Sequence, residues 1–260
     1  MMNQKLLFFD IDGTLLNERT HTIASSTVKA IAQAKQNGHL VFINTGRTRA
    51  TIDSCIAALQ PDGYVCGCGT YISYLDEVLY HHRITAKRCH ELLSLIASHQ
   101  LYAIFEASDK IYFQSQCDDP VVKSIYQMYD QAHFPLGFFE DEDVHLDKFC
   151  IQFYHDVSAF YHAIEHDFDI IKRNPVFSEI VPAKHSKATG IQFLIDHFHL
   201  SLDDCYVFGD SFNDESMLSY VKHSIVMKNG DPELFKLAEY VTDDIDHDGI
   251  AKALKHYHLI

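Results

Sequence analysis

Short apolar runs alternate with stretches of helical periodicity along much of this chain, and this alternation limits its possible folds more strongly than any other feature. Residues 6–10 (LLFFD) and 39–44 (HLVFIN) have the length and composition of buried strands, and residues 24–37 between them carry apolar side chains at helical spacing. A strand, a helix and a second strand in this order form a right-handed unit with parallel strands. The sequence therefore predicts an α/β fold built on a parallel sheet.

Residues 83–182 interrupt this pattern. Two strand-length runs, 101–107 and 110–115, follow each other closely, as in an antiparallel hairpin, among segments of helical periodicity. Such a length is far too great for a connecting loop, so we expect an inserted α+β domain here. Strands and helices alternate again from residue 183 onward, which predicts a discontinuous core formed by residues 1–82 and 183–260.

Helical periodicity also predicts the further helices of the chain. In the core, these are residues 49–59, 187–198, 213–221, 232–238 and 249–257. In the insertion, residues 86–99 and 157–166 are predicted to be helical, and a third helix is expected to begin at Asp119-Pro120, as an N-cap followed by proline.

Acidic residues outnumber basic ones, 36 to 21, and give the 260-residue chain a formal net charge of −15. This charge repels phosphate backbones and anionic membranes, so neither nucleic acid nor a membrane is expected as a partner. No apolar run reaches the length of about 18 residues that predicts a membrane span, and the N-terminal segment becomes acidic too early for a signal peptide. Seven cysteines without a CxxC pair indicate reduced thiols in a cytoplasmic protein.

The segment FFDIDGTL (residues 8–15) places two carboxylates, Asp10 and Asp12, just beyond the end of a predicted strand. In open α/β sheets this is where ligands bind, and Gly13 permits the tight turn. Clustered carboxylates suit a hard cation such as Mg²⁺. One of them could attack an electrophile while the other transfers a proton. The alternative interpretation is a solvated acidic turn.

Two further segments could bind an anion. In INTGR (residues 43–47), Thr45 offers a hydroxyl and Gly46 an accessible backbone N–H, although an N-cap and turn are the favoured interpretation when this segment is taken alone. Lys187 lies at the start of a predicted helix and could neutralise a transferring phosphoryl group or hold a carboxylate nucleophile. Taken alone, a solvated surface lysine is the simpler interpretation.

In VFGDSFND (residues 207–214), Asp210 ends a predicted strand, while Asn213 and Asp214 open the next helix. Helix capping is the alternative interpretation and does not exclude a ligand role. A parallel sheet would bring all four polar segments to one edge. Together they provide carboxylates, a hydroxyl, a lysine and accessible backbone, which fits Mg²⁺-assisted phosphoryl transfer.

These four segments, in this order, resemble the motifs of the haloacid dehalogenase-like hydrolase superfamily. The insertion lies where the C2-type cap of that superfamily lies. The mixed pattern of the insertion is similar to the Cof-type (type IIB) sugar-phosphatase-like branch. Two segments near the C-terminus of the chain are also similar to that branch, IVMKNGDPELFKLAEYVT (225–242) and DHDGIAKAL (246–254). The resemblance covers essentially the whole chain and implies a Rossmann-like core with an inserted α+β C2-type cap.

The resemblance also implies a role for each motif residue. Asp10 would be the nucleophile that forms an aspartyl-phosphate, and Asp12 the general acid and then the base. The phosphoryl-binding residues would be Thr45, Gly46, Lys187 and Asn213, and Arg47 would face the cap or the substrate. The ligands of Mg²⁺ would be Asp10, the backbone carbonyl of Asp12, and Asp210, supported by Asp214.

One segment departs from the family pattern. Cys68-Gly69-Thr70 stands where the family often has Asn-Gly-Ala, in a loop that usually borders the leaving-group pocket. Because Cys68 replaces the family's Asn, this position lacks an amide that could donate and accept hydrogen bonds. The family's substrate preferences are therefore not transferred to this chain. Asn44 stands where a small apolar residue is common, and its amide could partly replace the missing one.

The function predicted from these observations is Mg²⁺-dependent hydrolysis of a small phosphomonoester, such as a sugar phosphate or a related phosphorylated metabolite. A sugar phosphomutase would use the same nucleophile but return the phosphoryl group to the sugar. A ligand-binding regulator on the same fold is a non-enzymatic alternative, although a pure binder has no need for both Asp10 and Asp12. Product analysis separates the first two, and turnover of an aryl phosphate excludes the third.

Overall fold

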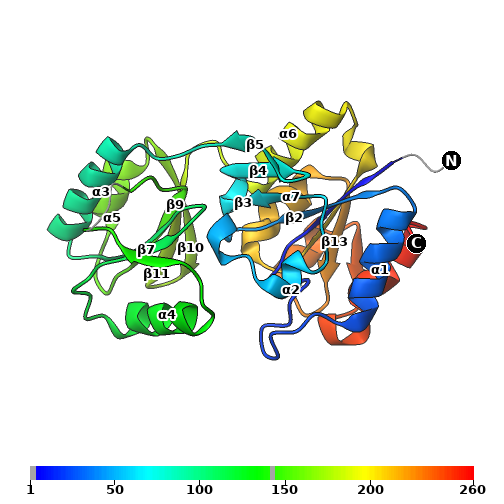
Figure 1. Cartoon of the computed structure of the whole chain (residues 1–260), viewed down its shortest axis with the longest axis horizontal. Helices are drawn as coiled ribbons and strands as arrows, with labels where there is room; N and C mark the ends of the chain where they lie inside the picture. Colours follow the sequence, from blue (N-terminus) through cyan, green and yellow to red (C-terminus); the bar gives the residue numbers. More distant parts are fainter. Residues whose placement is uncertain (1–3, 141–143) are drawn as a thin grey trace. The chain divides into compact units, whose positions relative to one another are not determined.

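The computed structural model describes residues 4–140 and 144–260, and these residues divide into two compact units (Figure 1). The first unit contains the described residues up to Gly46 together with Ile52–Leu79 and Ser186–Ile260. The second unit contains Tyr80–His185 and the short segment Arg47–Thr51. The first unit is thus discontinuous in sequence. No helix among the described residues is long and apolar enough to span a bilayer.

A sheet of eight strands forms the centre of the first unit. In sheet order, the strands are β14 (Tyr240–Thr242), β13 (His223–Met227), β12 (Cys205–Gly209), β1 (Leu6–Phe9), β2 (Leu40–Asn44), β3 (Gly63–Cys66), β4 (Tyr71–Tyr74) and β5 (Glu77–His81). The strands from β14 to β3 are parallel, and β4 pairs with β3 in the antiparallel direction. The predicted α/β fold with a parallel sheet is therefore confirmed.

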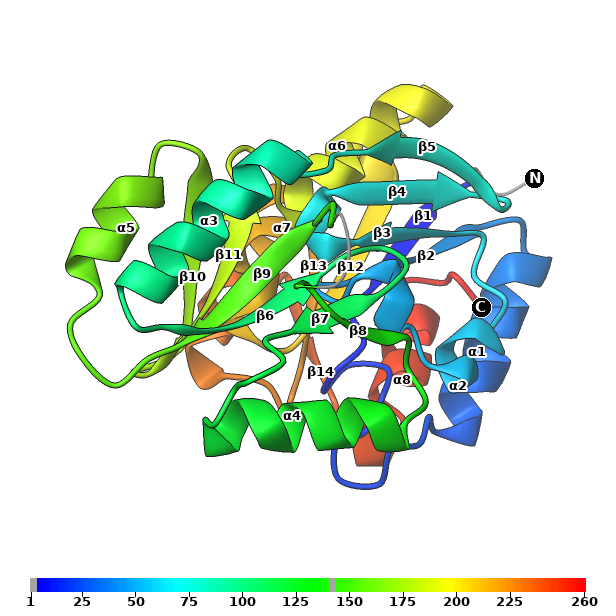
Figure 2. The ribbon, with the colours of Figure 1, turned by 60° about the vertical axis from the view of Figure 1, so that its left-hand side comes forward.

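Helices cover both faces of this sheet, which explains why its central strands are apolar throughout. On one face lie α1 (Ser25–Gln36), α2 (Ser54–Ala57) and α8 (Gly249–His256), and on the other α6 (Lys187–Phe198) and α7 (Glu215–Tyr220). Figure 2 shows α1 beside α8. Within β1, Leu7 and Phe9 pack toward α1 and α8, whereas Leu6 and Phe8 pack toward α6 and α7.

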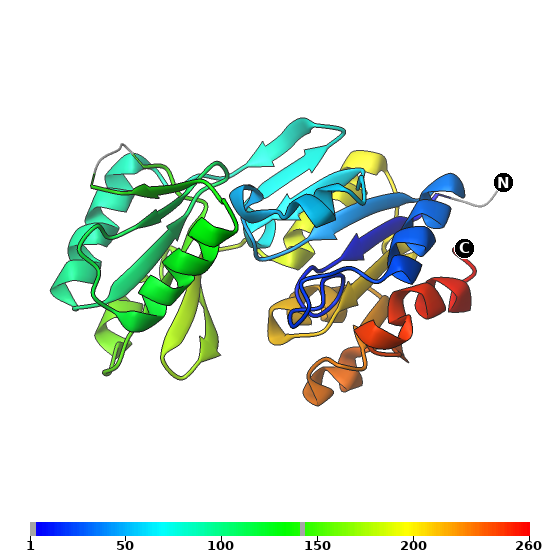
Figure 3. The ribbon, with the colours of Figure 1, turned by 60° about the horizontal axis from the view of Figure 1, so that its bottom comes forward.

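The second unit has its own sheet of six strands and its own core. In sheet order, the strands are β10 (Phe168–Asn174), β11 (Phe177–Pro182), β9 (Lys148–Gln152), β6 (Tyr102–Glu106), β7 (Ile111–Phe113) and β8 (Leu136–Phe138). One face carries α3 (Ala86–Ser98) and α5 (Ser158–Ile164), and the other carries α4 (Pro120–Gln131), as Figure 3 also shows. The predicted hairpin of β6 and β7 and the Asp119 N-cap of α4 are confirmed.

Two predicted core helices are wrong. Residues 49–59 form a 3₁₀ turn over Arg49–Thr51 and, after the extended Asp53, the single turn of α2. The Arg47 guanidinium donates to the Thr51 carbonyl at 3.0 Å, so this side chain occupies an oxygen that a continuous helix would use. Residues 232–237 form a 3₁₀ helix, which ends where the Ser224 hydroxyl donates to the Leu237 carbonyl.

Candidate active site

Three adjacent parallel strands deliver the polar motifs to one edge of the first unit's sheet. Asp10 follows β1 and continues its pairing, because its N–H donates to the Phe208 carbonyl at 3.0 Å. Thr45 follows β2, and its N–H donates to the Val65 carbonyl at 2.9 Å. Asp210 follows β12 directly. The ends of parallel strands are where open α/β sheets bind ligands, so these residues define a candidate site.

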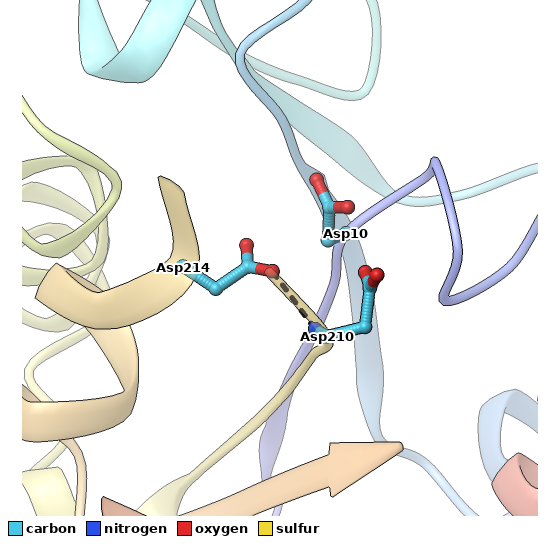
Figure 4. Close-up of side chains that lie close together, drawn as sticks. All are labelled: Asp10, Asp210 and Asp214. Atoms are coloured by element: carbon cyan, nitrogen blue, oxygen red, sulfur yellow. Dashed lines mark hydrogen bonds between the residues drawn. The ribbon is translucent and has the colours of Figure 1, made fainter. Parts of the chain in front are cut away.

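Three carboxylates converge at this edge (Figure 4). Asp10, Asp210 and Asp214 each offer an oxygen, and these oxygens all lie within 4.8 Å of one another. Asp10 and Asp214 are buried, and Asp210 is partly buried. Asp214 is further fixed because its Oδ2 accepts from the N–H groups of Asp210, at 2.9 Å, and Ser211, at 3.1 Å. The cluster is therefore a preformed set of oxygen donors.

Lys187 joins this cluster from α6 as a buried cation. Its side chain is fully buried, and Nζ donates to Asp10 Oδ1 at 2.5 Å and also to Asp214 Oδ1. Lys187 is the first residue of α6, and the Ser186 capping box fixes where that helix begins. The interpretation of Lys187 as a solvated surface lysine is excluded by this burial.

The pKa values of these groups reflect an excess of buried negative charge. Burial, followed by the charge of Asp214, raises the pKa of Asp10 to about 7, although Lys187 opposes the shift. Burial and the charges of Asp10 and Asp214 raise the pKa of Asp210 to about 8. Burial alone would lower the pKa of Lys187, but Asp10 and Asp214 outweigh it and raise that pKa above its ordinary range. One ammonium does not balance three carboxylates, so the cluster favours a further cation.

The turn after β1 is held against the cluster by Gly13, which the sequence analysis selected for this turn, and by Thr14 and Asn229, which it did not select. Gly13 has φ +78°, and a Cβ atom there would lie 2.2 Å from Asp210 Oδ2. The Thr14 hydroxyl donates to Asp210 Oδ1 at 2.9 Å, and the Asn229 amide donates to the Gly13 carbonyl at 2.8 Å. Asn229 belongs to the segment 225–242 that carries the family resemblance, which is the only sequence feature that points to it.

The remaining predicted residues occupy different places. Thr45 and Gly46 are buried beside the end of β2, and Asp12 is partly exposed in the turn after β1. Asn213 lies in a 3₁₀ turn, where its Oδ1 accepts from the Ser211 hydroxyl at 2.5 Å. Ser211 is the N-cap of this 3₁₀ turn, and Asp214 is the N-cap of α7, where its side chain makes no capping hydrogen bond. Arg47 belongs to the second unit.

The departing loop Cys68-Gly69-Thr70 lies against the second motif. The Cys68 N–H donates to the Thr45 carbonyl at 3.2 Å, and Cys68 has the left-handed φ of 56°. The Thr70 hydroxyl donates to the Gly67 carbonyl at 3.0 Å, which keeps the loop compact. The Asn44 amide donates to the Lys187 carbonyl at 3.1 Å, so this hydrogen bond goes to α6 and not to the loop.

Comparison with known proteins agrees with this fold. Residues 7–254 match the haloacid dehalogenase-like hydrolase family. YkrA of Bacillus subtilis (strain 168), a protein provisionally named a phosphatase, is 30% identical over 100% of both chains. HMP-PP phosphatase of Escherichia coli is 27% identical over 88% of this chain and 86% of its own.

Solved structures give the same result. A subclass IIB sugar phosphatase of the haloacid dehalogenase superfamily has a TM-score of 0.84 and 31% identity, and the match covers 99% of this chain and 100% of the other. A protein from Geobacillus kaustophilus has a TM-score of 0.86 and 29% identity over 99% of this chain and 100% of the other. The chain belongs to the haloacid dehalogenase-like hydrolase family. Within that family it is a phosphatase-type enzyme of the Cof-type, subclass IIB branch.

Proposed function

We propose that the chain is a Mg²⁺-dependent phosphatase that hydrolyses small phosphomonoesters through an aspartyl-phosphate intermediate on Asp10. The arrangement that carries this proposal is the buried Lys187 ammonium between Asp10 and Asp214, next to Asp210. A lysine in this position neutralises phosphoryl charge while it holds the attacking carboxylate in place. Positioning and charge neutralisation provide most of the catalysis in phosphoryl transfer.

The oxygen donors of the cluster fit Mg²⁺, which binds to carboxylates and carbonyl oxygens. Asp10, Asp210 and the backbone carbonyl of Asp12 would hold the ion. Both oxygens of Asp214 already accept hydrogen bonds, one from Lys187 and one from backbone N–H groups, which favours an indirect, supporting role. When bound, Mg²⁺ supplies positive charge to the transferring phosphoryl group and draws it toward the nucleophile.

The chain's own residues would carry out two successive displacements at phosphorus. In the first, a carboxylate oxygen of Asp10 forms the new bond, the bond to the leaving oxygen breaks, and Asp12 gives its proton to the departing alkoxide. In the second, Asp12 takes a proton from water, whose oxygen attacks the same phosphorus and releases phosphate and the Asp10 carboxylate. Thr45, Lys187 and the Gly46 N–H would bind phosphoryl oxygens in both steps, assisted by Asn213.

We propose small phosphorylated metabolites, including sugar phosphates, as the substrates. The names of the relatives support this, because one solved relative is a sugar phosphatase and one curated relative is HMP-PP phosphatase. The residues at the sheet edge would recognise only the phosphoryl group. We propose that the second unit acts as the cap, and that Arg47, which groups with it, faces the substrate's leaving group or the cap itself.

Phosphate release from p-nitrophenyl phosphate and from a library of sugar phosphates tests the proposal. We expect turnover with Mg²⁺, loss of turnover in EDTA, and recovery when Mg²⁺ is added back. Asp10→Asn should abolish turnover, whereas Asp243→Asn, which alters an exposed ion pair with Lys252, should not change it. Release of an isomerised sugar phosphate in place of free phosphate would identify a mutase. Full activity of Asp10→Asn would show that the nucleophile is assigned wrongly.

A further inference from the structure

Asn44 is a fully buried polar residue that has no assigned part in the reaction. It is the last residue of β2, directly before Thr45. Side chains alternate along a strand, so Asn44 lies on the same face as Phe42, which packs in the cluster formed with α6 and α7. There its Nδ2 donates to the Lys187 carbonyl at 3.1 Å and lies 3.5 Å from Met217 Sδ.

The Asn44 amide lowers the stability of the fold relative to an apolar side chain at this position. Asn44 Oδ1 is buried and accepts no hydrogen bond from the described residues. A buried acceptor without a donor destabilises a fold, and an apolar side chain would avoid that penalty. The orientation of the amide is nevertheless fixed, because the reversed arrangement would place Oδ1 against the Lys187 carbonyl. What distinguishes Asn44 from an apolar residue is therefore its hydrogen bond to Lys187.

We propose that Asn44 is a positioning residue for Lys187, an inference that rests on the proposed phosphatase function. The Lys187 side chain is fully buried where it reaches Asp10 and Asp214, so a shift of its backbone would also displace its ammonium. The Ser186 capping box sets where α6 begins. The Asn44 hydrogen bond ties that beginning to the end of β2. It thereby couples Lys187 to Thr45, the next residue after Asn44.

This coupling has a kinetic consequence. A ground-state phosphate ester tolerates a small displacement of the ammonium better than a transition state does, since the latter needs its charges aligned with the nucleophile. Loss of the hydrogen bond should therefore lower kcat more than it raises KM. Misplacement by about 1 Å can lower a rate by about 10²-fold, and we expect a decrease of roughly tenfold to 10²-fold in kcat.

Two substitutions separate the hydrogen bond from the volume of the side chain. Asn44→Leu fills the space without the donor, and Asn44→Ala removes both. We expect both variants to lose kcat with Mg²⁺ and p-nitrophenyl phosphate, with KM changed by less than about threefold. Ile43→Ala is the matched control, because Ile43 is equally buried in β2 but faces α1 and α8. It should lower thermal stability and leave kcat of the folded enzyme unchanged.

A double-mutant cycle tests whether Asn44 acts through Lys187. The readout is the affinity for orthovanadate, whose trigonal-bipyramidal adduct mimics the phosphoryl-transfer transition state, in the presence of Mg²⁺. It is measured for wild type, Asn44→Leu, Lys187→Met and the double variant. We expect Asn44→Leu to weaken vanadate binding in the wild-type background and to have no effect in the Lys187→Met background. An equal effect in both backgrounds would overturn the proposal.

Failure of this inference is distinguishable from failure of the proposed function. A wild-type protein that neither hydrolyses phosphomonoesters nor binds phosphate would contradict the phosphatase assignment itself. An active wild type with Asn44→Leu at unchanged kcat would overturn only the role of Asn44. If Lys187→Met does not fold, the kinetics of Asn44→Leu and Asn44→Ala against Ile43→Ala still decide the question.

Discussion

At the scale of single residues, the buried charges of the candidate site compensate one another through shared partners. Lys187 is shared by Asp10 and Asp214, and Asp214 also accepts two backbone N–H groups. Removing one member of such a buried set leaves an uncompensated charge, which costs about 3–5 kcal/mol in comparable buried pairs. From the sequence, Asp10 was selected at the end of a predicted strand, and Lys187 and Asp214 were selected at the starts of predicted helices. The contacts of Thr14 and Asn229 were not predictable, because their partners Asp210 and Gly13 lie 196 and 216 positions away.

Asp12 provides the sharpest test of the acid–base assignment. Asp12→Asn keeps the shape of the side chain and removes its ability to exchange a proton. Because proton transfer by a positioned side chain contributes about 10²–10⁴-fold, we expect kcat to fall within that range. Mg²⁺ affinity should be preserved, since the proposed ligand is the backbone carbonyl. An unchanged kcat across the whole pH profile would contradict the role.

The acidic cluster also makes stability depend on pH when no metal ion is bound. Asp10 and Asp210 have pKa values of about 7 and about 8 in the folded chain, against about 3.9 for an ordinary aspartate. Between pH of about 4 and 8, the folded protein therefore holds more protons at this cluster than the unfolded one. The cluster's contribution to the free energy of unfolding falls as pH rises through this window, by at most about 1.4 kcal/mol per pH unit for each such proton.

Urea unfolding in EDTA at pH 5 and pH 8 measures this dependence. Asp210→Asn is the comparison, because it removes one of the titrating groups and should make the loss of stability between the two pH values smaller. Adding Mg²⁺ should stabilise the wild type more at pH 8 than at pH 5, because the ion binds to ionised carboxylates. Equal pH dependence in wild type and Asp210→Asn would contradict the assignment of these pKa values.

At the scale of secondary-structure elements, the turn that follows β1 fixes the site's geometry. Gly13 has a positive φ and lies against the Asp210 carboxylate, so Gly13→Ala would add both backbone strain and a side-chain clash. We expect it to lower the free energy of unfolding by more than about 1 kcal/mol. It should also weaken Mg²⁺ binding, measured by titration.

Gly38→Ala is the matched control for this substitution. Gly38 also has a positive φ, but a Cβ atom there would meet nothing within 4 Å. Its variant should lose stability through backbone strain alone and keep its Mg²⁺ affinity and kcat. If both variants bind Mg²⁺ equally well, the close approach of Gly13 to Asp210 is not required for the metal site.

Elements that are buried on both faces were predicted well from sequence, and elements that depend on a specific partner were not. The central strands β1, β2 and β12 follow from their continuous apolar runs. β8, in contrast, is only three residues long, contains Gly137, and exists through its parallel pairing with β7. The segment 49–59 has helical periodicity, yet one hydrogen bond from Arg47 to the Thr51 carbonyl accompanies its division into two short turns.

At the scale of the whole molecule, two units with separate cores divide the proposed tasks of chemistry and selection. The residues of the first unit would recognise only the phosphoryl group, which all phosphomonoesters share. Replacing residues 83–182 by a short Gly/Ser linker should therefore reduce selectivity among sugar phosphates and relatively favour extended phosphoesters.

The measurement is kcat/KM for several sugar phosphates, an aryl phosphate and a phosphopeptide, with and without the replaced segment. Circular dichroism and urea unfolding establish that the shortened protein is folded before its rates are compared. The same order of substrates in both proteins would place specificity in the first unit and contradict the proposed cap.

The pairing of β1 with β12 also has a consequence for biosynthesis. Leu6 pairs with Cys205, so the first strand leaves the ribosome long before its neighbour in the sheet exists. At about 5–20 residues per second, that interval lasts on the order of 10–40 seconds. All of Tyr80–His185 emerges within it, and the described residues of this segment form a hydrophobic core of their own. The inserted unit can thus fold first, before Lys187, Asp210 and Asp214 have been synthesised. A nascent chain that ends before Lys187 therefore lacks the acidic cluster and would be inactive.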